Sequence, residues 1–156
     1  MPDRLRAELK QTKPFPSRSA EALLSVLRTA AILEHQLGEA LKPYGITMTQ
    51  YNVLRILRGA GKNGLCGREV GERMVSSVPD VSRLLDRMEE IGLIQRERDE
   101  ADRRHVTARI TVKGLDLVTQ VTPRLEVIER ARFGHLDGDR LDAVIGALED
   151  VRAAGE

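Results

Sequence analysis

Two clusters of residues between positions 76 and 104 carry the side chains that could do chemistry in this chain. The first shares one side of a helical pattern and holds hydroxyl, carboxyl and guanidinium groups: Ser77, Asp80, Ser82, Arg83 and Arg87. The second is a charged run between two strand-like segments: Asp102, Arg103 and Arg104. Guanidinium groups pair with phosphates and make two hydrogen bonds to guanine in the major groove of DNA. The clusters therefore indicate a nucleic-acid contact, although a solvated surface is the alternative for each cluster taken alone.

An amphipathic helix is needed to present the first cluster. Its apolar face is predicted by residues that recur every three or four positions: Val81, Leu84, Leu85, Met88 and Ile91. We expect Ser77 to be the N-cap of this helix, with Pro79 in the first turn and Gly92 as the C-terminal stop. The polar cluster then lies on the opposite side.

This helix is acidic on balance. Between residues 76 and 92, two arginines oppose four carboxylates, a net charge of −2: Arg83 and Arg87 against Asp80, Asp86, Glu89 and Glu90. Attraction by bulk charge is therefore weak, and DNA binding would depend on individual side chains. Arg83 is the best suited to guanine, whereas Asp80 would either accept a hydrogen bond from cytosine N4 or cap the helix.

A β-hairpin is predicted directly after this helix. Residues 93–98 alternate only roughly between apolar and polar, whereas residues 105–111 alternate well and are rich in β-branched side chains. Residues 99–104 between them have the charge and the turn propensity of a loop. A helix that could enter the major groove, beside a hairpin that could reach the minor groove, is a winged helix-turn-helix.

The segment from Arg83 to Gly114 resembles the core of the MarR family of bacterial transcriptional regulators. Three elements carry the resemblance in the family's order and spacing: Met88-Glu89 with Gly92-Leu93, then Asp102-Arg103-Arg104, then Ile110-Thr111 with Gly114. The resemblance extends over about residues 20–152. It implies a mainly α-helical fold with a small β-hairpin, in which a winged helix-turn-helix is joined to N- and C-terminal dimerisation helices. It also implies a sequence-specific DNA-binding transcriptional regulator, commonly a repressor that a small ligand releases.

The resemblance assigns roles to the wing. Arg104, the last residue of the Asp-x-Arg element, would enter the minor groove. Asp102 would orient Arg104 or pair with a neighbouring basic residue, and Arg103 would contact phosphate. Asp80 departs from the small hydroxyl residue expected in many relatives, so its role stays open between a base contact and a cap.

The rest of the chain is expected to form an arm and one domain. Residues 1–16 would be a flexible N-terminal arm, and residues 17–153 a MarR-type winged-helix domain. Within the domain, about 47–111 would form the DNA-binding lobe, and about 17–42 and 112–153 the dimerisation helices.

Six helices are expected around the hairpin, each with its own start or stop signal. They are 17–42, which begins at Ser17 or Ser19, a helix that begins with a Thr47/Gln50 capping box, 67–74, the helix after a turn at Val75-Ser76, 112–132, which Thr111 caps, and a last helix capped by Asp137. The apolar faces of the first and last helices suggest an isologous homodimer. Two recognition helices would then meet half-sites of a pseudo-palindromic operator in double-stranded DNA, about 34 Å apart. The alternative is that these helices pack only within their own chain.

The resemblance further implies a small aromatic or phenolic ligand in a cleft between the dimer helices and the winged domain. The candidate residues are His35, Tyr44, Met48 and Tyr51, and each has an alternative place in the core or at its rim.

Cys66 suggests a second kind of response. It stands at the expected start of helix 67–74, where a thiolate has a lowered pKa and is more easily oxidised. Redox-sensing relatives usually carry the reactive cysteine near the N-terminus, which this chain does not. A redox-active Cys66 and a buried, inert Cys66 are the two hypotheses.

Composition and motifs argue against other classes of protein. The chain has 156 residues, a net charge of +1, one cysteine and three scattered histidines, so neither a disulfide framework nor a metal site is predicted. No nucleophile–base pair or phosphate loop is present, so we expect no enzyme and no cofactor. No apolar run could span a membrane, so a cytoplasmic protein is expected. The runner-up is a winged-helix module that binds protein and not DNA, which would not need the charged tip at 102–104.

Overall fold

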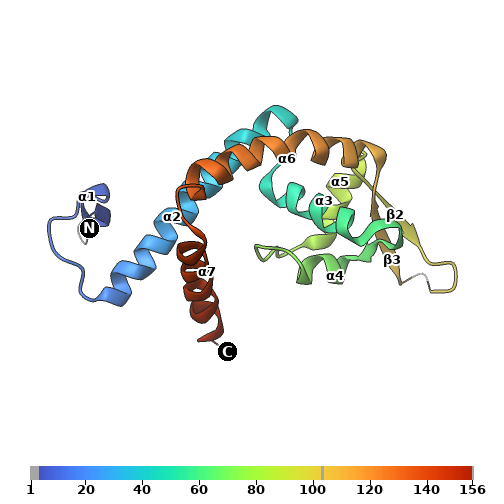
Figure 1. Cartoon of the computed structure of the whole chain (residues 1–156). Coiled ribbons are helices and arrows are strands. Elements are labelled where there is room, and N and C mark those ends of the chain that lie inside the picture. Colours follow the sequence, from blue (N-terminus) through green and yellow to red (C-terminus); the bar gives the residue numbers. More distant parts are fainter. Residues whose placement is uncertain (1–3, 103, 156) are drawn as a thin grey trace.

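The computed structural model describes residues 4–102 and 104–155, and the chain is mostly helical over these residues. Seven α-helices, two 3₁₀ turns and three short strands make up this part of the chain (Figure 1). In order they are α1 (Arg4–Glu8), α2 (Arg18–Leu41), η1 (Lys42–Tyr44), α3 (Met48–Ala60), η2 (Gly61–Asn63), β1 (Leu65–Cys66), α4 (Gly67–Glu72), α5 (Val81–Glu90), β2 (Ile94–Arg98), β3 (Val106–Ile110), α6 (Val112–Phe133) and α7 (Gly138–Ala153).

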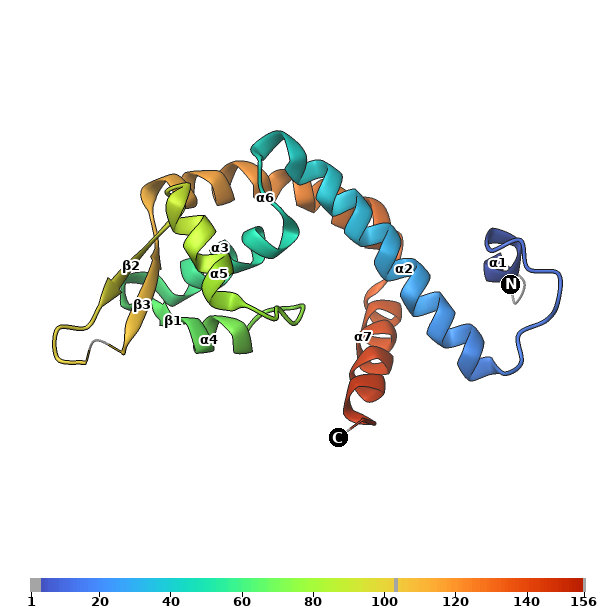
Figure 2. The same ribbon diagram turned by 180° about the vertical axis from the view of Figure 1, so that it is seen from behind.

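The elements separate into two regions. One is a winged lobe, residues 47–111, which contains α3, α4, α5 and the three strands. The other consists of the terminal helices α1, α2, α6 and α7. Figures 1 and 2 show α2 and α6 side by side in an arch that joins the lobe to the far end of the molecule, where α1 and α7 lie. The wing tip projects from the opposite end, away from both termini.

A three-stranded antiparallel sheet supports the wing. Its strand order is β1-β3-β2, so β3 lies in the middle. Ile94 pairs with Ile110 at the base of the hairpin, and Arg98 pairs with Val106 near its tip. The hairpin was predicted from the sequence, but β1 was not, because two residues are too short to show alternation. Gly64 permits this pairing: it has a φ of +66°, and a Cβ there would collide with the backbone oxygen of Ala108.

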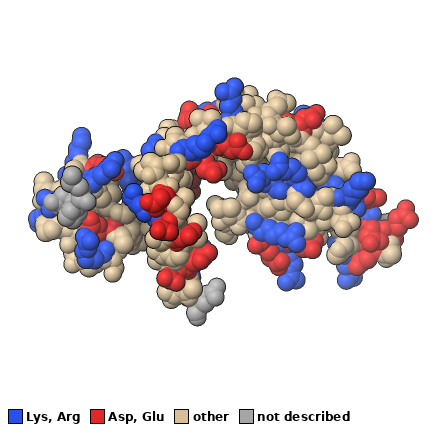
Figure 3. Space-filling model, viewed as in Figure 1, with Lys and Arg blue, Asp and Glu red and all other residues tan. Residues whose placement is uncertain are grey.

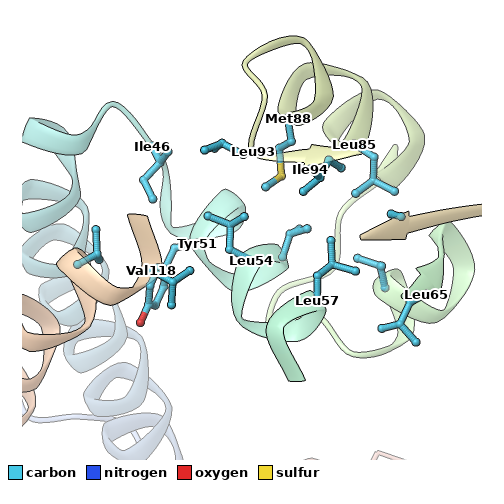
Figure 4. Close-up of a cluster of buried hydrophobic side chains, with 14 of the residues drawn as sticks. Ile46, Tyr51, Leu54, Leu57, Leu65, Leu85, Met88, Leu93, Ile94 and Val118 are labelled. Carbon is cyan, nitrogen blue, oxygen red and sulfur yellow. The ribbon is translucent and has the colours of Figure 1, made fainter. Parts of the chain in front are cut away.

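The core lies inside the winged lobe and beneath α6. Its side chains come from α3, α5, the sheet and the middle of α6, as Figure 4 shows for residues such as Leu54, Met88, Ile94 and Val118. The buried hydrophobic residues are Leu41, Ile46, Tyr51, Val53, Leu54, Leu57, Leu65, Val70, Leu85, Met88, Leu93, Ile94, Ala108, Val118 and Val121. Gly114 allows the start of α6 to pack closely, because a Cβ there would meet the backbone oxygen of Leu93.

Four helix starts follow the capping signals of the sequence. The Ser17 hydroxyl accepts a hydrogen bond from the Ala20 N–H at 3.0 Å, and Thr47 forms the expected capping box with Gln50. Thr111 caps α6 and Asp137 caps α7 in the same way. The N-terminal arm contains the one-turn helix α1, where the sequence had suggested no regular structure.

The start of α5 differs from the prediction. Ser77 is not its N-cap; Asp80 is, since its Oδ1 accepts the Arg83 N–H at 2.9 Å. Pro79 lies before the helix and not in its first turn. Its ring disfavours helical geometry at the preceding residue, which delays the helix to Val81. The expected two-residue turn at Val75-Ser76 is therefore part of a longer segment, residues 73–80, between α4 and α5.

Within the described residues, no helix is long and apolar enough to cross a membrane.

Candidate nucleic-acid interface

The exposed side of α5 presents two arginines that are free to bind a ligand. Leu85 and Met88 are buried on the inner side, while Ser82, Arg83 and Arg87 are exposed on the outer side. Within residues 4–102 and 104–155, the guanidinium groups of Arg83 and Arg87 form neither a hydrogen bond nor an ion pair. This helix therefore offers the donors that a phosphate or a guanine edge requires.

Asp80 and Ser77 lie at the approach to this helix. The Asp80 carboxylate accepts a hydrogen bond from the Arg83 N–H, so the structure supports the capping alternative for Asp80. Ser77 is exposed in the segment before α5, outside the helix on which it was expected. The helix-turn-helix thus keeps its arginines where the sequence indicated, but its entry is an extended segment.

The wing tip is shaped by two aspartates. The Asp99 carboxylate accepts the Ala101 N–H at 2.7 Å, and the Asp102 carboxylate accepts the Arg104 N–H at 3.0 Å. The His105 N–H also donates to the Asp102 backbone oxygen at 2.8 Å. Asp102 therefore fixes the backbone of Arg104, and the Arg104 side chain is exposed. Arg103, the expected phosphate contact, lies outside the described residues.

A charged network that the sequence did not reveal joins α5 to the wing. Arg96 of β2 reaches the Glu89 carboxylate with its Nε at 3.0 Å and its Nη2 at 2.9 Å, and it also pairs with Asp86. These hydrogen bonds from Arg96 hold the pKa of the Glu89 carboxyl below its ordinary value. Two of the four carboxylates that make the recognition helix acidic are thus paired with a strand residue.

Arg96 escaped prediction because its strand alternates poorly. Glu89 and Arg96 are seven residues apart, on either side of the turn at Gly92, which has a φ of +77°. Gly92 was the available signal: a left-handed residue there reverses the chain and brings β2 back along α5. Nothing in the sequence distinguishes the pair of Glu89 and Arg96 from the many other possible pairs of charged residues.

Basic side chains are also exposed on the other helices of the winged lobe. Lys and Arg gather over the helices of the winged lobe on the face that Figure 3 displays, whereas Asp and Glu gather over α7. Exposed basic residues of α3, η2, α4 and the segment after α4 are Arg55, Arg58, Lys62, Arg68 and Arg73. Charge is thus distributed unevenly even though the whole chain carries only +1.

Three of the four candidate ligand residues line one groove. His35, Met48 and Tyr51 border a groove of about 940 Å³ between α2, the start of α3 and the segment Met74–Ser76. Tyr44 does not belong to it: η1 turns Tyr44 toward a separate groove of about 690 Å³ beside Ile91 and Leu93. Tyr44 therefore lies apart from the other three candidate residues.

The main groove has polar groups that sequence reasoning missed. Arg55 donates from its Nη1 to the Tyr51 hydroxyl at 3.3 Å, and that hydroxyl lies 3.1 Å from the Thr122 Oγ1 of α6. Asn52 also lines the groove, and its Oδ1 accepts the Val75 N–H at 2.8 Å. Through Asn52, the wall of the groove is attached to the segment that leads into α5.

Cys66 lies at the N-terminus of α4 and is half-buried. Its N–H donates to the Glu69 carboxylate at 2.8 Å, and this hydrogen bond is the main reason that the pKa of Glu69 is lowered. Among the described residues, no group of three or more His, Cys, Asp or Glu side chains could hold a metal ion.

This arrangement of a helix-turn-helix followed by a β-hairpin wing defines the winged-helix class of folds. The model of the MarR family matches residues 46–106, which span the helix-turn-helix and most of the wing. The transcriptional regulator HosA of Escherichia coli O111:H- is 30% identical over 106 residues, which are 68% of this chain and 73% of that protein.

Solved structures of MarR family regulators have a similar fold. AbsC, a MarR family transcriptional regulator from Streptomyces coelicolor, has a TM-score of 0.77 at 27% identity and covers 92% of this chain and 100% of its own. MepR of S. aureus in complex with DNA has a TM-score of 0.76 at 22% identity and covers 83% of this chain and 96% of its own. The chain belongs to the MarR family and is a transcriptional regulator of that family.

Proposed function

We propose that this protein is a homodimeric regulator that binds a pseudo-palindromic operator in double-stranded DNA and represses transcription until a small ligand releases it. One observation carries the DNA-binding part: α5 exposes Arg83 and Arg87, which have no partner among the described residues, beside a wing that exposes Arg104. The DNA complex of the structural relative MepR supports the same use of the fold.

The contacts divide by groove. Arg83 and Arg87, with Ser82, would face base edges or phosphates in the major groove, and Arg83 is the one we assign to guanine. Arg104 would enter the flanking minor groove, with its backbone fixed by Asp102. Arg103 would contact phosphate, and Ser77 would donate to phosphate from the segment before α5.

A second copy of the chain would complete the assembly. The terminal helices expose large apolar side chains, among them Leu23, Leu27, Ile145 and Val151, which are 54–68% exposed. Many large apolar side chains exposed on two helices favour a protein interface there. An isologous dimer through α2 and α7 would set the two α5 helices about 34 Å apart, one turn of DNA.

The groove beside α2 is the proposed ligand site. It has a volume of about 940 Å³, aromatic and methionine side chains from α3, and polar groups from Arg55 and Asn52. Such a mixture suits a small aromatic or phenolic ligand. The hydrogen bond between Asn52 and Val75 would couple ligand binding to α5. A molecule that displaces Asn52 would release the segment that precedes the recognition helix.

The test is a selection of genomic fragments that the pure protein retains, followed by titration of a retained duplex across a salt series. A specific regulator should prefer the retained duplex to a scrambled one of equal length. The logarithm of its affinity should fall linearly with the logarithm of the salt concentration, with a slope proportional to the number of phosphates it contacts. If no fragment is enriched and the two duplexes bind equally, DNA-specific regulation is wrong, and the protein-binding winged-helix module becomes the better reading.

A further inference from the structure

We propose that Arg96 makes the recognition helix fit to approach DNA by offsetting part of the negative charge of Asp86 and Glu89, without touching DNA itself. This inference rests on the proposed function and assigns a positioning residue to it. The site is an ion-pair cluster between α5 and β2 that carries three charged side chains.

The geometry of the cluster is that of a fixed support. The Arg96 side chain is only 20% exposed, and it lies between its own strand and the side of α5. Its Nε and Nη2 both donate to Glu89 Oε2, at 3.0 and 2.9 Å, and Nη2 also donates to Asp86 Oδ1. The Arg96 backbone N–H donates to the other Glu89 oxygen at 2.9 Å. Three donors of Arg96, the backbone N–H, the Nε and the Nη2, are thus engaged within the protein.

The two carboxylates lie close to the side chains proposed to meet DNA. Asp86 follows Arg83 by three positions and Ser82 by four, so it occupies the same side of α5 one turn further on. Glu89 comes three residues later. Without a partner, both would present negative charge toward phosphates across a gap from which water is partly excluded, where repulsion is stronger than in bulk water.

The cluster also changes the meaning of the charge count. Residues 76–92 carry a net −2, which on its own argues against DNA binding. Asp80 is engaged as the helix cap, and Asp86 and Glu89 are engaged by Arg96. Arg83 and Arg87, in contrast, have no partner among the described residues. Of the four carboxylates, only Glu90 has no such contact among the described residues. The helix therefore offers free positive charge, and most of its carboxylates are already engaged.

A variant cycle separates neutralisation from mere mechanical support. Four proteins are compared on a duplex retained from genomic DNA by the wild type: wild type, Arg96→Met, Asp86→Asn/Glu89→Gln, and the triple variant. Arg109→Met is the matched control, because Arg109 lies on the adjacent strand, pairs with Glu97 at 2.7 Å, and has no partner on α5. Affinity is measured near 50 and near 200 mM salt, and thermal unfolding shows that each variant folds.

Neutralisation predicts that Arg96→Met weakens binding about tenfold at low salt and less at high salt, because salt screens the exposed carboxylates. In the Asp86→Asn/Glu89→Gln background, the same change should cost no more than Arg109→Met does. Arg96→Lys, which keeps the charge but loses the planar fork, should retain affinity within about threefold. It also serves as the informative variant if Arg96→Met fails to fold.

Two results would overturn the inference while leaving the proposed function intact. The first is a wild-type protein that binds the duplex and an Arg96→Met variant that binds it equally well. The second is an equal loss from Arg96→Met in both backgrounds, which would make Arg96 a mechanical tether. A wild-type protein that retains no genomic fragment would overturn the proposed function, and this inference with it.

Discussion

The winged lobe and the terminal helices use similar leucine-rich patterns for opposite purposes. In the lobe, α3 buries Tyr51, Val53, Leu54 and Leu57 completely or nearly so. In the terminal region, α1 and α7 bury no described residue, and α2 buries only Leu41 at its end. The lobe has therefore buried its apolar faces within one chain, together with Val118 and Val121 of α6, whereas α2 and α7 still expose large apolar side chains.

This difference supports the proposal that DNA binding and dimerisation belong to separate parts of the molecule. A substitution in the lobe should act on folding or on DNA contacts in each protomer. A substitution on α2 or α7 should act on the association of two protomers and reach DNA only through it. Each of the following predictions tests that separation.

The largest effect is expected from Leu54→Ala in the core of the lobe. Leu54 is fully buried beside Gly114 of α6, so its removal leaves a cavity and should lower the free energy of unfolding by about 2–5 kcal/mol. Urea unfolding measures it. The control is Leu27→Ala, the same truncation at a side chain that is 56% exposed. An equal loss at both positions would erase the contrast between the two regions.

Ile145→Asp should disrupt the proposed dimer. Ile145 is 54% exposed on α7, and a carboxylate buried there against a second copy would weaken association by roughly 2–4 kcal/mol. Light scattering over a dilution series gives the molar mass, and near-ultraviolet spectra report on the lobe. Asp142→Asn is the control, since it changes an exposed polar position of the same helix. A variant that remains dimeric at every dilution would place the interface elsewhere.

Arg104→Ala should weaken DNA binding by about 1–3 kcal/mol while leaving the molar mass unchanged. The reason is the loss of an exposed guanidinium at the wing tip, whose backbone Asp102 holds in place. Titration of an operator duplex at several salt concentrations measures the effect. Unchanged affinity at all of them would remove Arg104 from the interface and leave the helix α5 as the reader of sequence.

Glu89→Gln should have the smallest effect, and one that depends on pH. Hydrogen bonds from Arg96 lower the pKa of Glu89 in the folded protein, so the ion pair stabilises the fold above the unfolded-state pKa of about 4.3. The stabilisation is lost as the pH falls through the lowered pKa. Because the Glu89 side chain is 38% exposed, we expect at most about 1 kcal/mol near neutral pH.

Urea unfolding of wild type and Glu89→Gln between neutral and acidic pH measures this difference, with Glu90→Gln as the control at an exposed neighbour. The two curves should converge in acid. A gap that persists below the lowered pKa would show that Glu89 acts through something other than its charge.

The sequence predicted those parts of the fold that depend on local signals. Caps at Ser17, Thr47, Thr111 and Asp137 place four helix starts correctly, because each is a contact between a side chain and a backbone N–H within three residues. The same rule failed at Ser77, where Pro79 prevents the helix from starting and Asp80 is the next residue able to cap it. Ser77 and Asp80 are both good N-cap residues, and the proline ring between them favours Asp80.

Contacts between distant residues were out of reach. The pairing of Leu65 with Ala108, the Asn52 hydrogen bond to Val75, and the exclusion of Tyr44 from the main groove all depend on how elements pack. The arginines of α5 and the wing were identified because side-chain chemistry alone marks them. Their role as DNA contacts remains a prediction. The contacts of Arg96 with Asp86 and Glu89, in contrast, could be identified only from the three-dimensional structure.

The position of Glu89 has a further consequence at the rim of the sheet. The strand β2 is an edge strand, since the order is β1-β3-β2, and an open edge invites another chain to add a strand. Glu89 occupies the outward Arg96 N–H of that edge at 2.9 Å. A chain that tried to extend this sheet would first have to displace a carboxylate from its hydrogen bonds. The contact thus opposes strand-to-strand aggregation and leaves the exposed apolar helices as the surface through which we propose that two copies associate.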